Sequence, residues 1–432
     1  MPSTSSLPGF RDFYPAELAI RSHITGAWRE VARRYAFEEY DGPPLESLEL
    51  YTAKSGDEIV GQLYSFEDKG GRAVALRPEM TPSLARMVGA RAGGLRKPIR
   101  WFSVPQLFRY ERTQRGRLRE HYQWNVDILG EEDIGADAEV LATALDGLRL
   151  LGLGPGDVIA RYSDRRLLEK LLLHAGVPGD RLGAAFVAID KLLREPEPRI
   201  RQRLVDAQLE GEVADRVLEL FRLRDLDALV AAHGHEADVR PELDRLGAYR
   251  GHLEDLGLGD MVAFDPTIVR GLAYYTGTVF EIFDRKGELR AVCGGGRYDD
   301  LLHSISGAAL PAVGFGMGDV VLAELLAGRG LLPAYSPRID YFIVAVSDAE
   351  RSLQRRVAAS LRARGHAVAY GLRATSMRAQ LKEADARGAL HVVVLGPDEV
   401  AARTAQLRDM ESGVQRTVPL DELLDAPPAS AA

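Results

Sequence analysis

Arginine side chains crowd one short segment of the chain and could bind a phosphate-bearing ligand. The segment FRYERTQRGRLREHYQ contains Arg109, Arg112, Arg115, Arg117 and Arg119. Guanidinium groups bind phosphate through paired hydrogen bonds, and a cluster of them focuses positive potential in a chain whose formal charge is −8. The aromatic residues interleaved with them are Phe108, Tyr110, His121, Tyr122 and Trp124. Because bases stack on aromatic rings, the segment predicts a nucleotide site, the alternative being a solvated charged turn.

A set of hydrogen-bond acceptors lies on either side of this segment. Glu79 ends one expected strand, and Gln123 and Asp127 are four residues apart on another. Side chains alternate between the two faces of a strand, so Gln123 and Asp127 point to the same side of the sheet. Carboxylates on a sheet face suit a ligand that carries an ammonium group. Two polar residues that face solvent on an edge strand are the alternative.

Two further segments combine tyrosines, an arginine and glycines. Arg270 precedes Tyr274 and Tyr275 in RGLAYY, and Tyr298 follows a run of glycines in CGGGRYDD. Glycines let a ligand approach the backbone closely, and phenol groups donate or accept hydrogen bonds. The two segments together predict a ligand platform, although each alone is also compatible with a simple turn and strand.

These residues must be positioned by the strands and helices of a mixed domain. Period-two alternation predicts a hairpin over 63–79 and strands over 99–110, 124–130 and 158–162. Helical spacing predicts helices over 18–31, 83–92 and 137–151. From about 166 to 256 the chain has helical spacing without a convincing strand, so we expect a helical insertion. The strand pattern resumes at 261, and a glycine-rich strand over 311–317 leads into a helix over 320–326.

A second domain is expected beyond a proline-containing linker at 331–337. Strands and helices then alternate, with strands over 340–346, 367–370 and 390–395 and helices over 349–364 and 376–387. This alternation predicts a small α/β domain with a largely parallel sheet.

Length and composition exclude several classes of protein. The 432 residues predict about three domains, and the 46% hydrophobic and 27% charged content excludes collagen-like, coiled-coil and disordered chains. We expect a cytoplasmic protein, because no apolar run would cross a bilayer, no secretory signal is evident, and a single cysteine, Cys293, fits a reducing compartment. Walker A, G-x-S-x-G, H-E-x-x-H and dinucleotide-binding motifs are all missing from the sequence.

Taken together, these segments resemble the histidyl-tRNA synthetase family of class II aminoacyl-tRNA synthetases, over nearly the whole chain. LPGFRDFYP is similar to the family's N-terminal entry, GPPLE to motif 1, and FRYERTQRGRLREHYQWNVDILG to motif 2 and its loop. VRGLAYY and CGGGRYD resemble the two histidine-specific peptides. SMRAQLKEADARGALHVVVLG resembles part of the family's anticodon-binding domain.

The resemblance implies an α+β fold with an antiparallel-sheet catalytic domain, a helical insertion and a C-terminal α/β anticodon-binding domain. The expected boundaries are 1–165 and 257–330 for the catalytic domain, 166–256 for the insertion and 338–425 for the anticodon-binding domain. It also implies a homodimer, with the proline of motif 1 at the interface.

The implied activity is that of a histidine–tRNA ligase, which activates L-histidine with ATP and transfers it to the 3′ end of tRNA(His). Magnesium is expected with ATP, but no carboxylate cluster in the sequence identifies its ligands. The implied catalytic residues are Arg109 and Arg270. The implied ATP-binding residues are Arg109, Arg117, Gln123 and Arg270. The implied histidine-binding residues are Glu79, Thr81, Gln123, Asp127, Tyr274, Tyr275 and Tyr298.

The chain departs from the family pattern at three positions. Val321 stands where motif 3 normally has an ATP-binding arginine, so weaker phosphate binding is expected unless another arginine of the motif 2 loop compensates. Ala273 replaces an aspartate before the tyrosine pair, and Asp127 replaces a glutamate while keeping its charge. The alternative to the ligase is a non-catalytic histidine sensor that resembles the regulatory subunit of ATP phosphoribosyltransferase, although such subunits generally lack the C-terminal domain that this chain has.

Overall fold

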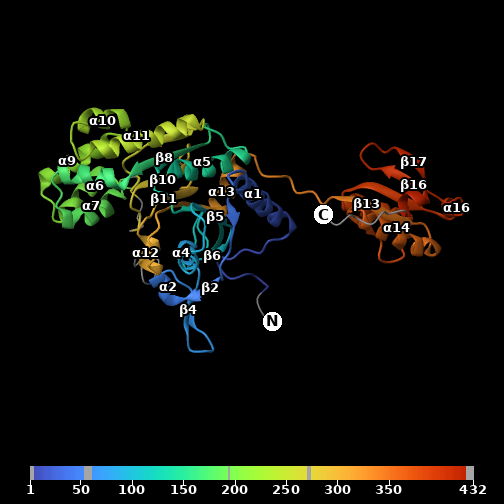
Figure 1. The fold of residues 1–432 in the computed structure, drawn as a ribbon. Helices are drawn as coiled ribbons and strands as arrows, with labels where there is room; N and C mark the ends of the chain where they lie inside the picture. Colours follow the sequence, from blue (N-terminus) through green and yellow to red (C-terminus); the bar gives the residue numbers. More distant parts are fainter. Residues whose placement is uncertain (1–3, 53–60, 193–194, 270–273, 425–432) are drawn as a thin grey trace. The chain divides into compact units, whose positions relative to one another are not determined.

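The computed structural model describes residues 4–52, 61–192, 195–269 and 274–424. The chain divides into two compact units, residues 1–333 and 334–432 (Figure 1). Within the described ranges, no helix combines the length and the apolar character that crossing a membrane requires.

A nine-stranded sheet forms the centre of the first unit. Its strands are β1 (Glu38–Glu39), β5 (Ile99–Ser103), β6 (Gln106–Phe108), β7 (Glu120–Leu129), β8 (Val158–Asp164), β9 (Val262–Phe264), β10 (Thr278–Asp284), β11 (Cys293–Arg297) and β12 (Ala312–Gly318). The order is β1-β5-β7-β12-β11-β10-β8-β9, and β6 pairs with β7. Only β1–β5 and β8–β9 are parallel, so the antiparallel sheet that the resemblance implies is confirmed.

The expected strand over 99–110 is two strands in the structure, and the next strand begins earlier than expected. β5 and β6 are separated at Val104 and Pro105, since proline has no N–H to donate to a ladder. β7 begins at Glu120 rather than at 124, because its first residues pair with β6. His121 and Gln123 are therefore strand residues at the edge of the arginine-rich loop.

One face of this sheet carries glycines in its middle strands. Residues opposite one another on antiparallel strands share a face. Gly314, Gly316 and Gly318 of β12 lie opposite Asp127, Asn125 and Gln123 of β7. Gly294 and Gly296 of β11 lie opposite Gly316 and Gly314. We call these five residues (Gly294, Gly296, Gly314, Gly316 and Gly318) the glycine shelf.

The other face of the sheet is apolar and packs against helices α1 (Pro15–Arg34), α5 (Ile134–Leu150) and α13 (Asp319–Gly328). Trp28 of α1 stacks on Trp124 of β7 with ring centroids 6.0 Å apart, and Trp124 meets Phe315 edge-on at 5.1 Å. A Cβ on Gly147 of α5 would lie 2.5 Å from the Trp124 ring, so glycine is required for this helix to approach the sheet. One face thus carries the main core. The glycine-bearing face is covered in part by a smaller buried cluster that includes residues of α4 (Thr81–Gly89) and α12 (Leu301–Ser306).

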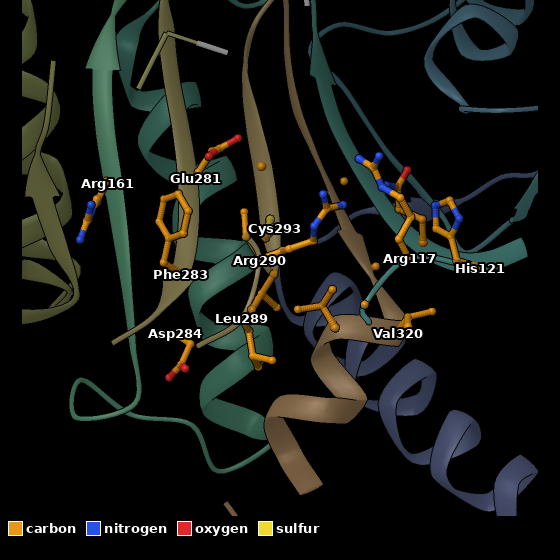
Figure 2. Close-up of a pocket in the computed structure, with 18 of the residues that line it drawn as sticks. Arg117, His121, Arg161, Glu281, Phe283, Asp284, Leu289, Arg290, Cys293 and Val320 are labelled. Carbon is orange, nitrogen blue, oxygen red and sulfur yellow. The ribbon is translucent and has the colours of Figure 1, made fainter. Parts of the chain in front are cut away.

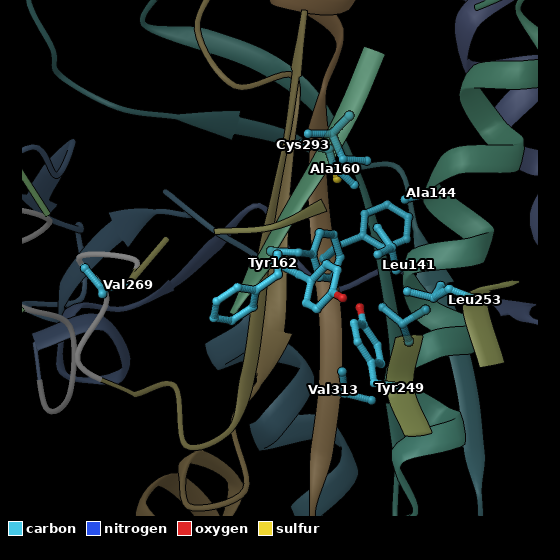
Figure 3. Packing of buried hydrophobic residues seen from close by; sticks show 14 of the residues in the cluster. Leu141, Ala144, Ala160, Tyr162, Tyr249, Leu253, Val269, Cys293 and Val313 are labelled. Carbon is cyan, nitrogen blue, oxygen red and sulfur yellow. The ribbon is translucent and has the colours of Figure 1, made fainter. Parts of the chain in front are cut away.

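The segment between β8 and β9 is helical. It contains α6 (Arg165–His174), η1 (Gly179–Arg181), α7 (Leu182–Ile189), α8 (Glu197–Asp206), α9 (Gly211–Arg222), α10 (Leu226–His233), α11 (Arg240–Asp255) and η2 (Gly259–Met261). Its buried residues belong to the same hydrophobic cluster as the sheet, so the two share one continuous core. Figure 3 shows Tyr249 of α11 reaching toward Tyr162 of β8, and their ring centroids are 5.1 Å apart.

A three-stranded sheet of β2 (Leu45–Ser47), β4 (Ala73–Leu76) and β3 (Ser65–Glu67) lies between β1 and β5 in the chain. β3 and β4 form the hairpin expected over 63–79. The short turn after β4 leads into α4 (Thr81–Gly89), so Glu79 and Thr81 lie at the junction of strand and helix. α2 (Leu48–Thr52) and α12 (Leu301–Ser306) complete the described helices of this unit.

The second unit has a five-stranded sheet in the order β14-β13-β15-β16-β17. Its strands are β13 (Ile339–Ala345), β14 (Val368–Tyr370), β15 (Ala389–Leu395), β16 (Thr404–Asp409) and β17 (Gln415–Pro419). Its helices are η3 (Asp348–Glu350), α14 (Arg351–Ala363), α15 (Met377–Ala386), α16 (Pro397–Ala401) and α17 (Leu420–Leu424).

The expectation of a largely parallel sheet in the second unit is wrong for its last two strands. The pairs of β13 with β14 and β15 are parallel, but the β15–β16 and β16–β17 pairs are antiparallel. Strands β16 and β17 were not predicted from the sequence. Most residues of β17 are exposed, so this edge strand lacks the alternating apolar pattern that identifies a strand.

Candidate active site

A pocket of about 780 Å³ opens on the glycine-shelf face of the large sheet. Figure 2 shows Glu281 and Phe283 on one strand, Arg161 on the neighbouring strand, and Arg117 and His121 on the opposite side. The floor of the pocket includes Gly294, Gly316 and Gly318. Further lining residues include Arg109, Glu111, Gln123, Thr267, Asp284, Arg290, Val320 and Val321.

Two of the five clustered arginines line this pocket. Arg117 Nε lies 2.6 Å from Glu111 Oε2, which holds its guanidinium at the wall. Arg109 Nε donates to the carbonyl oxygen of Pro78 at 2.9 Å. Because Pro78 directly precedes Glu79, this bond joins the pocket wall to the turn that carries Glu79. Both predicted phosphate ligands are therefore at the pocket, and both have a partner that fixes their position.

The other clustered arginines are not among the pocket-lining residues. Arg115 Nε donates to Glu324 of α13 at 3.0 Å, and the backbone N–H of Gly116 donates to the same carboxylate at 3.0 Å. Arg119 lies over the Tyr110 ring, 4.2 Å from its centroid. Arg112 is exposed. The tip of the loop is thus bonded to α13. Fewer arginines line the pocket than the clustering in the sequence suggested.

An ion-pair network holds the strand and the helix that flank the pocket. Arg11 Nε donates to Glu120 of β7 at 2.6 Å, and its Nη1 donates to Asp319 of α13 at 2.9 Å. Asp319 also accepts from the backbone N–H of Tyr122 at 2.9 Å. Asp319 and Glu120 are both buried, so losing Arg11 would leave two charges without compensation. This network assigns the N-terminal LPGFRDF segment a positioning role.

His121 lines the pocket as a neutral imidazole. Its burial, together with the positive charges of Arg109 and Arg11, lowers its pKa to about 3. An uncharged ring beside two arginines presents an aromatic face without adding a third positive charge. The sequence analysis named His121 only among the interleaved aromatic residues.

A second group of polar residues includes Asp127, which lies further along β7 than Gln123. The Tyr298 hydroxyl donates to Asp127 Oδ1, and both residues are buried. Tyr274 lies between two rings, with centroid distances of 4.9 Å to Tyr275 and 5.9 Å to Tyr298. Burial raises the pKa of Asp127 to about 7, even though the Tyr298 hydrogen bond acts in the opposite direction. We call Glu79, Asp127, Tyr274, Tyr275 and Tyr298 the acidic end.

Glu79 and Thr81 come from the turn before α4 and from its first residue, and Glu79 lies near Arg109. Glu79 is buried, which raises the pKa of its carboxyl, while the charge of Arg109 opposes that rise. Thr81 is half-buried at the first position of α4. Neither residue lines the 780 Å³ pocket, and nor do Asp127 and Tyr298, whereas Gln123 does. Of the predicted histidine ligands, Gln123 therefore lines the pocket, whereas the others are buried or half-buried and do not line it.

Two glycines of the shelf are required by the side chains beside them. A Cβ on Gly314 would lie 2.0 Å from Asp127 Oδ1, and a Cβ on Gly316 would lie 2.8 Å from the Gln123 amide. A Cβ on Gly318 would meet only His121, at 4.0 Å. The glycine pattern of β12, which is a weak signal in the sequence, is thus explained by the polar residues of β7.

Several lining residues have no counterpart in the sequence prediction. Glu281, Arg161 and Thr267 line the pocket from β10, β8 and the segment after β9. Tyr40, whose pKa burial raises well above its usual value, is close enough to Asp127 for that carboxylate to raise it further. None of these lies in a recognisable motif. The pairing of β8 with β10 places Arg161 opposite Glu281, and Thr267 and Tyr40 come from segments that follow β9 and β1. The predicted residues Arg270 and Ala273 lie outside the described residues.

The described part of the chain holds no group of three or more His, Cys, Asp or Glu side chains arranged for a metal ion. Magnesium that arrives with a nucleotide needs only one or two protein carboxylates, since phosphates and water supply its other ligands. Glu111 and Glu281 both line the pocket, and Glu111 is paired with Arg117.

Comparison with known proteins identifies the family. The family model described as histidyl-tRNA synthetase matches residues 9–319, and the model of an anticodon-binding domain matches residues 340–426. A histidine–tRNA ligase of Opitutus terrae is 44% identical over 430 residues, covering 98% of both chains. A histidine–tRNA ligase of Natronomonas pharaonis is 44% identical over 415 residues, covering 96% of this chain and 95% of the relative.

Solved structures share the fold. A histidyl-tRNA synthetase from Nostoc superposes with a TM-score of 0.81 at 24% identity and covers 98% of each chain. A Bacillus halodurans structure titled as an ATP phosphoribosyltransferase regulatory subunit/histidyl-tRNA synthetase gives a TM-score of 0.75 at 23% identity, covering 92% of this chain and 99% of that one. Since the family model spans most of the sequence and the 44% identical relatives span it almost completely, the chain belongs to the histidyl-tRNA synthetase family.

Proposed function

We propose that the glycine-shelf face activates L-histidine with ATP and that the product is then transferred to tRNA(His). The observation that carries the proposal is the pairing of two chemically opposite regions on one sheet face. The acidic end is enclosed and offers acceptors, whereas the pocket is open and offers arginines. Strand β7 connects them, with Gln123 in the pocket and Asp127 roughly 13 Å further along the strand.

The acidic end suits the histidine side chain and its ammonium group. A neutral imidazole has one donor and one acceptor nitrogen, so a site that offers both kinds of partner can select it. Asp127 supplies an acceptor, and the phenols near it can act in either role. Glu79, Thr81 and Gln123 are proposed to hold the ammonium group. A site of buried polar groups rejects apolar mimics, because they leave those groups unpaired.

The pocket suits the nucleotide. Arg109 and Arg117 are proposed to bind phosphates, and the neutral ring of His121 is proposed to stack on the base. Glu111 or Glu281, each a lining carboxylate, would hold a magnesium ion bound to the phosphates, which would neutralise part of their charge. Arg270, which lies outside the described residues, keeps its proposed role beside the reacting groups.

The reaction is then a matter of positioning and charge. A carboxylate oxygen of histidine attacks the α-phosphorus, and the bond from that phosphorus to the bridging oxygen breaks, so that pyrophosphate leaves with the electron pair. Arg109 is suited to stabilise the charge that develops, because it lies between Glu79 and the pocket. A hydroxyl of the terminal tRNA ribose then attacks the carbonyl of histidyl-adenylate, and AMP leaves.

The C-terminal unit and a homodimer complete the proposal. Residues 340–426 are proposed to bind the anticodon region, in keeping with their match to that domain model. The dimer is proposed to form through the GPPLE segment, where Leu45 is 38% exposed and Phe66 on the neighbouring hairpin is 52% exposed. Sedimentation velocity of the wild type and of Leu45→Glu tests this proposal. The wild type is expected to sediment as a dimer, and Leu45→Glu is expected to sediment as a monomer.

Histidine-dependent ATP–pyrophosphate exchange tests the activity, with the other amino acids as controls. Exchange with histidine alone is expected, followed by charging of tRNA(His). A protein that binds histidine by calorimetry but gives no exchange would instead be a histidine sensor. The structure titled as a regulatory subunit has the same fold, which is why this second outcome is tested directly.

A further inference from the structure

Val321 lies at the wall of the pocket beside an arginine from a different segment. Gly116, at the tip of the arginine-rich loop, has φ +71°. Val321 and Arg290 both lie close to this glycine. The point that a Cβ on Gly116 would occupy is 3.2 Å from Val321 Cγ2 and 4.0 Å from Arg290 Cδ. Val321 and Arg290 therefore flank the same point of the pocket.

Arg290 comes from the connection between β10 and β11, far from the arginine-rich loop in sequence. Figure 2 shows its side chain extended over the sheet, between Glu281 on one side and Arg117 on the other. Its head group thus lies near the middle of the pocket rather than at its rim.

Compensation from the arginine-rich loop itself, the expectation raised by the sequence, is less well supported. Arg115 is paired with Glu324 on α13, and Arg119 lies over the Tyr110 ring. Neither lines the pocket. Arg117 does, but it is already one of the two proposed phosphate ligands and so is not an additional cation. The loop keeps Arg109 and Arg117 at the pocket and offers no third arginine there.

We propose that Arg290 binds the outer phosphates of ATP and supplies the positive charge that position 321 lacks. The proposal rests on the assignment of the pocket to ATP. A guanidinium that enters from the β10–β11 connection reaches the same space as one attached to the first turn of α13, because Gly116 is in contact distance of both positions. An arginine contributes two parallel hydrogen bonds to a phosphate, whereas valine contributes none.

Steady-state ATP–pyrophosphate exchange on the full chain tests this with five proteins: wild type, R290A, R290K, V321R and R290A/V321R. R290A is expected to raise the KM for ATP about tenfold to a hundredfold. The KM for ATP of R290K should lie between those of the wild type and R290A, because lysine keeps the positive charge but cannot form two parallel hydrogen bonds to a phosphate. R290A/V321R should recover at least part of the loss, since the new arginine enters the same space.

Lys286→Ala is the matched control. Lys286 lies in the same connection and carries the same charge, but it does not line the pocket, so the KM for ATP should change less than twofold. Histidine affinity, measured by calorimetry without ATP, should be unchanged in R290A, and so should its thermal unfolding temperature. If the role of Arg290 were purely structural, R290A would lower both the histidine affinity and the thermal unfolding temperature.

The proposal is overturned if R290A and Lys286→Ala have the same KM for ATP, or if R290A weakens histidine binding as much as ATP binding. If the wild type gives no exchange, the proposed function fails, and ATP binding by calorimetry still decides the role of Arg290. Equal ATP affinity in the wild type and R290A would reject the proposed role of Arg290. The absence of ATP binding to either protein would reject it as well.

Discussion

The acidic end and the arginine pocket lie on the same face of the sheet, but different physical effects dominate in each of them. At the acidic end the polar groups are buried, so desolvation governs them and Asp127 titrates near neutral pH. In the pocket the arginines are partly exposed and held by carboxylates and carbonyls, so charge dominates. A buried acceptor distinguishes donors from non-donors, whereas an open cluster of cations attracts any phosphate.

The comparison teaches that selectivity for the amino acid and affinity for the nucleotide come from separate residues. Changes at the acidic end should alter histidine binding and leave ATP binding intact, and changes in the pocket should do the reverse. Arg109 is the exception, because it contacts the turn that carries Glu79 while lining the pocket.

The largest separation is expected for Asp127→Asn. Asparagine keeps the size and can still accept from Tyr298, but it loses the charged acceptor, so kcat/KM for histidine should fall roughly a hundredfold. The affinity for ATP should stay within about threefold. Exchange kinetics with each substrate varied in turn measure both effects. An equal loss for both substrates would mean that the two regions are not independent.

The same variant has a second readout in stability. The pKa of Asp127 is raised from 3.8 to about 7 in the folded protein, so the ionised carboxylate costs stability above pH 7, and that cost shrinks as the pH falls toward 4. Asp127→Asn should therefore raise the thermal unfolding temperature at pH 8 and raise it less at pH 5. A destabilised variant at pH 8 would contradict the burial argument.

The next largest effect is expected for Gly314→Ala. Its Cβ would lie 2.0 Å from Asp127 Oδ1 and 2.7 Å from the Val126 carbonyl oxygen, so Asp127 must move. We expect at least about tenfold weaker histidine binding by calorimetry, in line with the cost of overpacking. Gly318→Ala is the control, because its Cβ would meet only His121 at 4.0 Å. Equal histidine affinity in the two variants would show that the clash is relieved without moving Asp127.

A smaller effect is expected from pH. Since Asp127 titrates at about 7, roughly a tenth of the free protein has the ionised carboxylate at pH 6, and histidine should bind roughly tenfold more weakly there than at pH 8.5. Calorimetry across this range measures it. Free histidine also titrates in this range, so the same series on Asp127→Asn isolates the contribution of the protein. Parallel pH profiles for the two proteins would remove Asp127 as the cause.

The smallest effect is expected for His121→Phe in the pocket. Because the pKa of His121 is lowered to about 3, its ring is neutral throughout pH 5 to 9, and phenylalanine replaces one uncharged ring by another. The KM for ATP should change by less than about threefold and keep its pH profile. His121→Ala, which removes the ring, should have the larger effect. Equal values for the two variants would argue against stacking.

The sequence predicted the acidic end better than the pocket. Asp127 and Tyr298 lie in separate motifs that were both singled out, and the structure brings them into contact. Gln123 lies on β7 at the pocket, as strand alternation indicated, whereas Glu79 lies in the turn after β4 and not at the end of a strand. In the pocket, by contrast, only two of the five clustered arginines line the wall, and Glu281 was missed.

The physical reason for this contrast is the range of the interactions. Local spacing on β7 fixes which side chains share a face, so Gln123 and Asp127 could be placed together without a structure. Whether an arginine of a long loop faces a ligand depends on partners elsewhere, such as Glu324 for Arg115. The edge strand β17 was missed for a related reason, since its pairing with β16 leaves most of its side chains exposed.

By itself, then, the sequence determined the family, the strands that carry the motifs, and the chemical character of the ligand groups, because these depend on residue type and short-range spacing. The tertiary structure alone decided which arginines reach the pocket, since pairing across the sheet brings Arg290 beside Val321 from a distant segment. It also decided the protonation of Asp127 and His121, because desolvation depends on everything packed around a group and not on its neighbours in the chain.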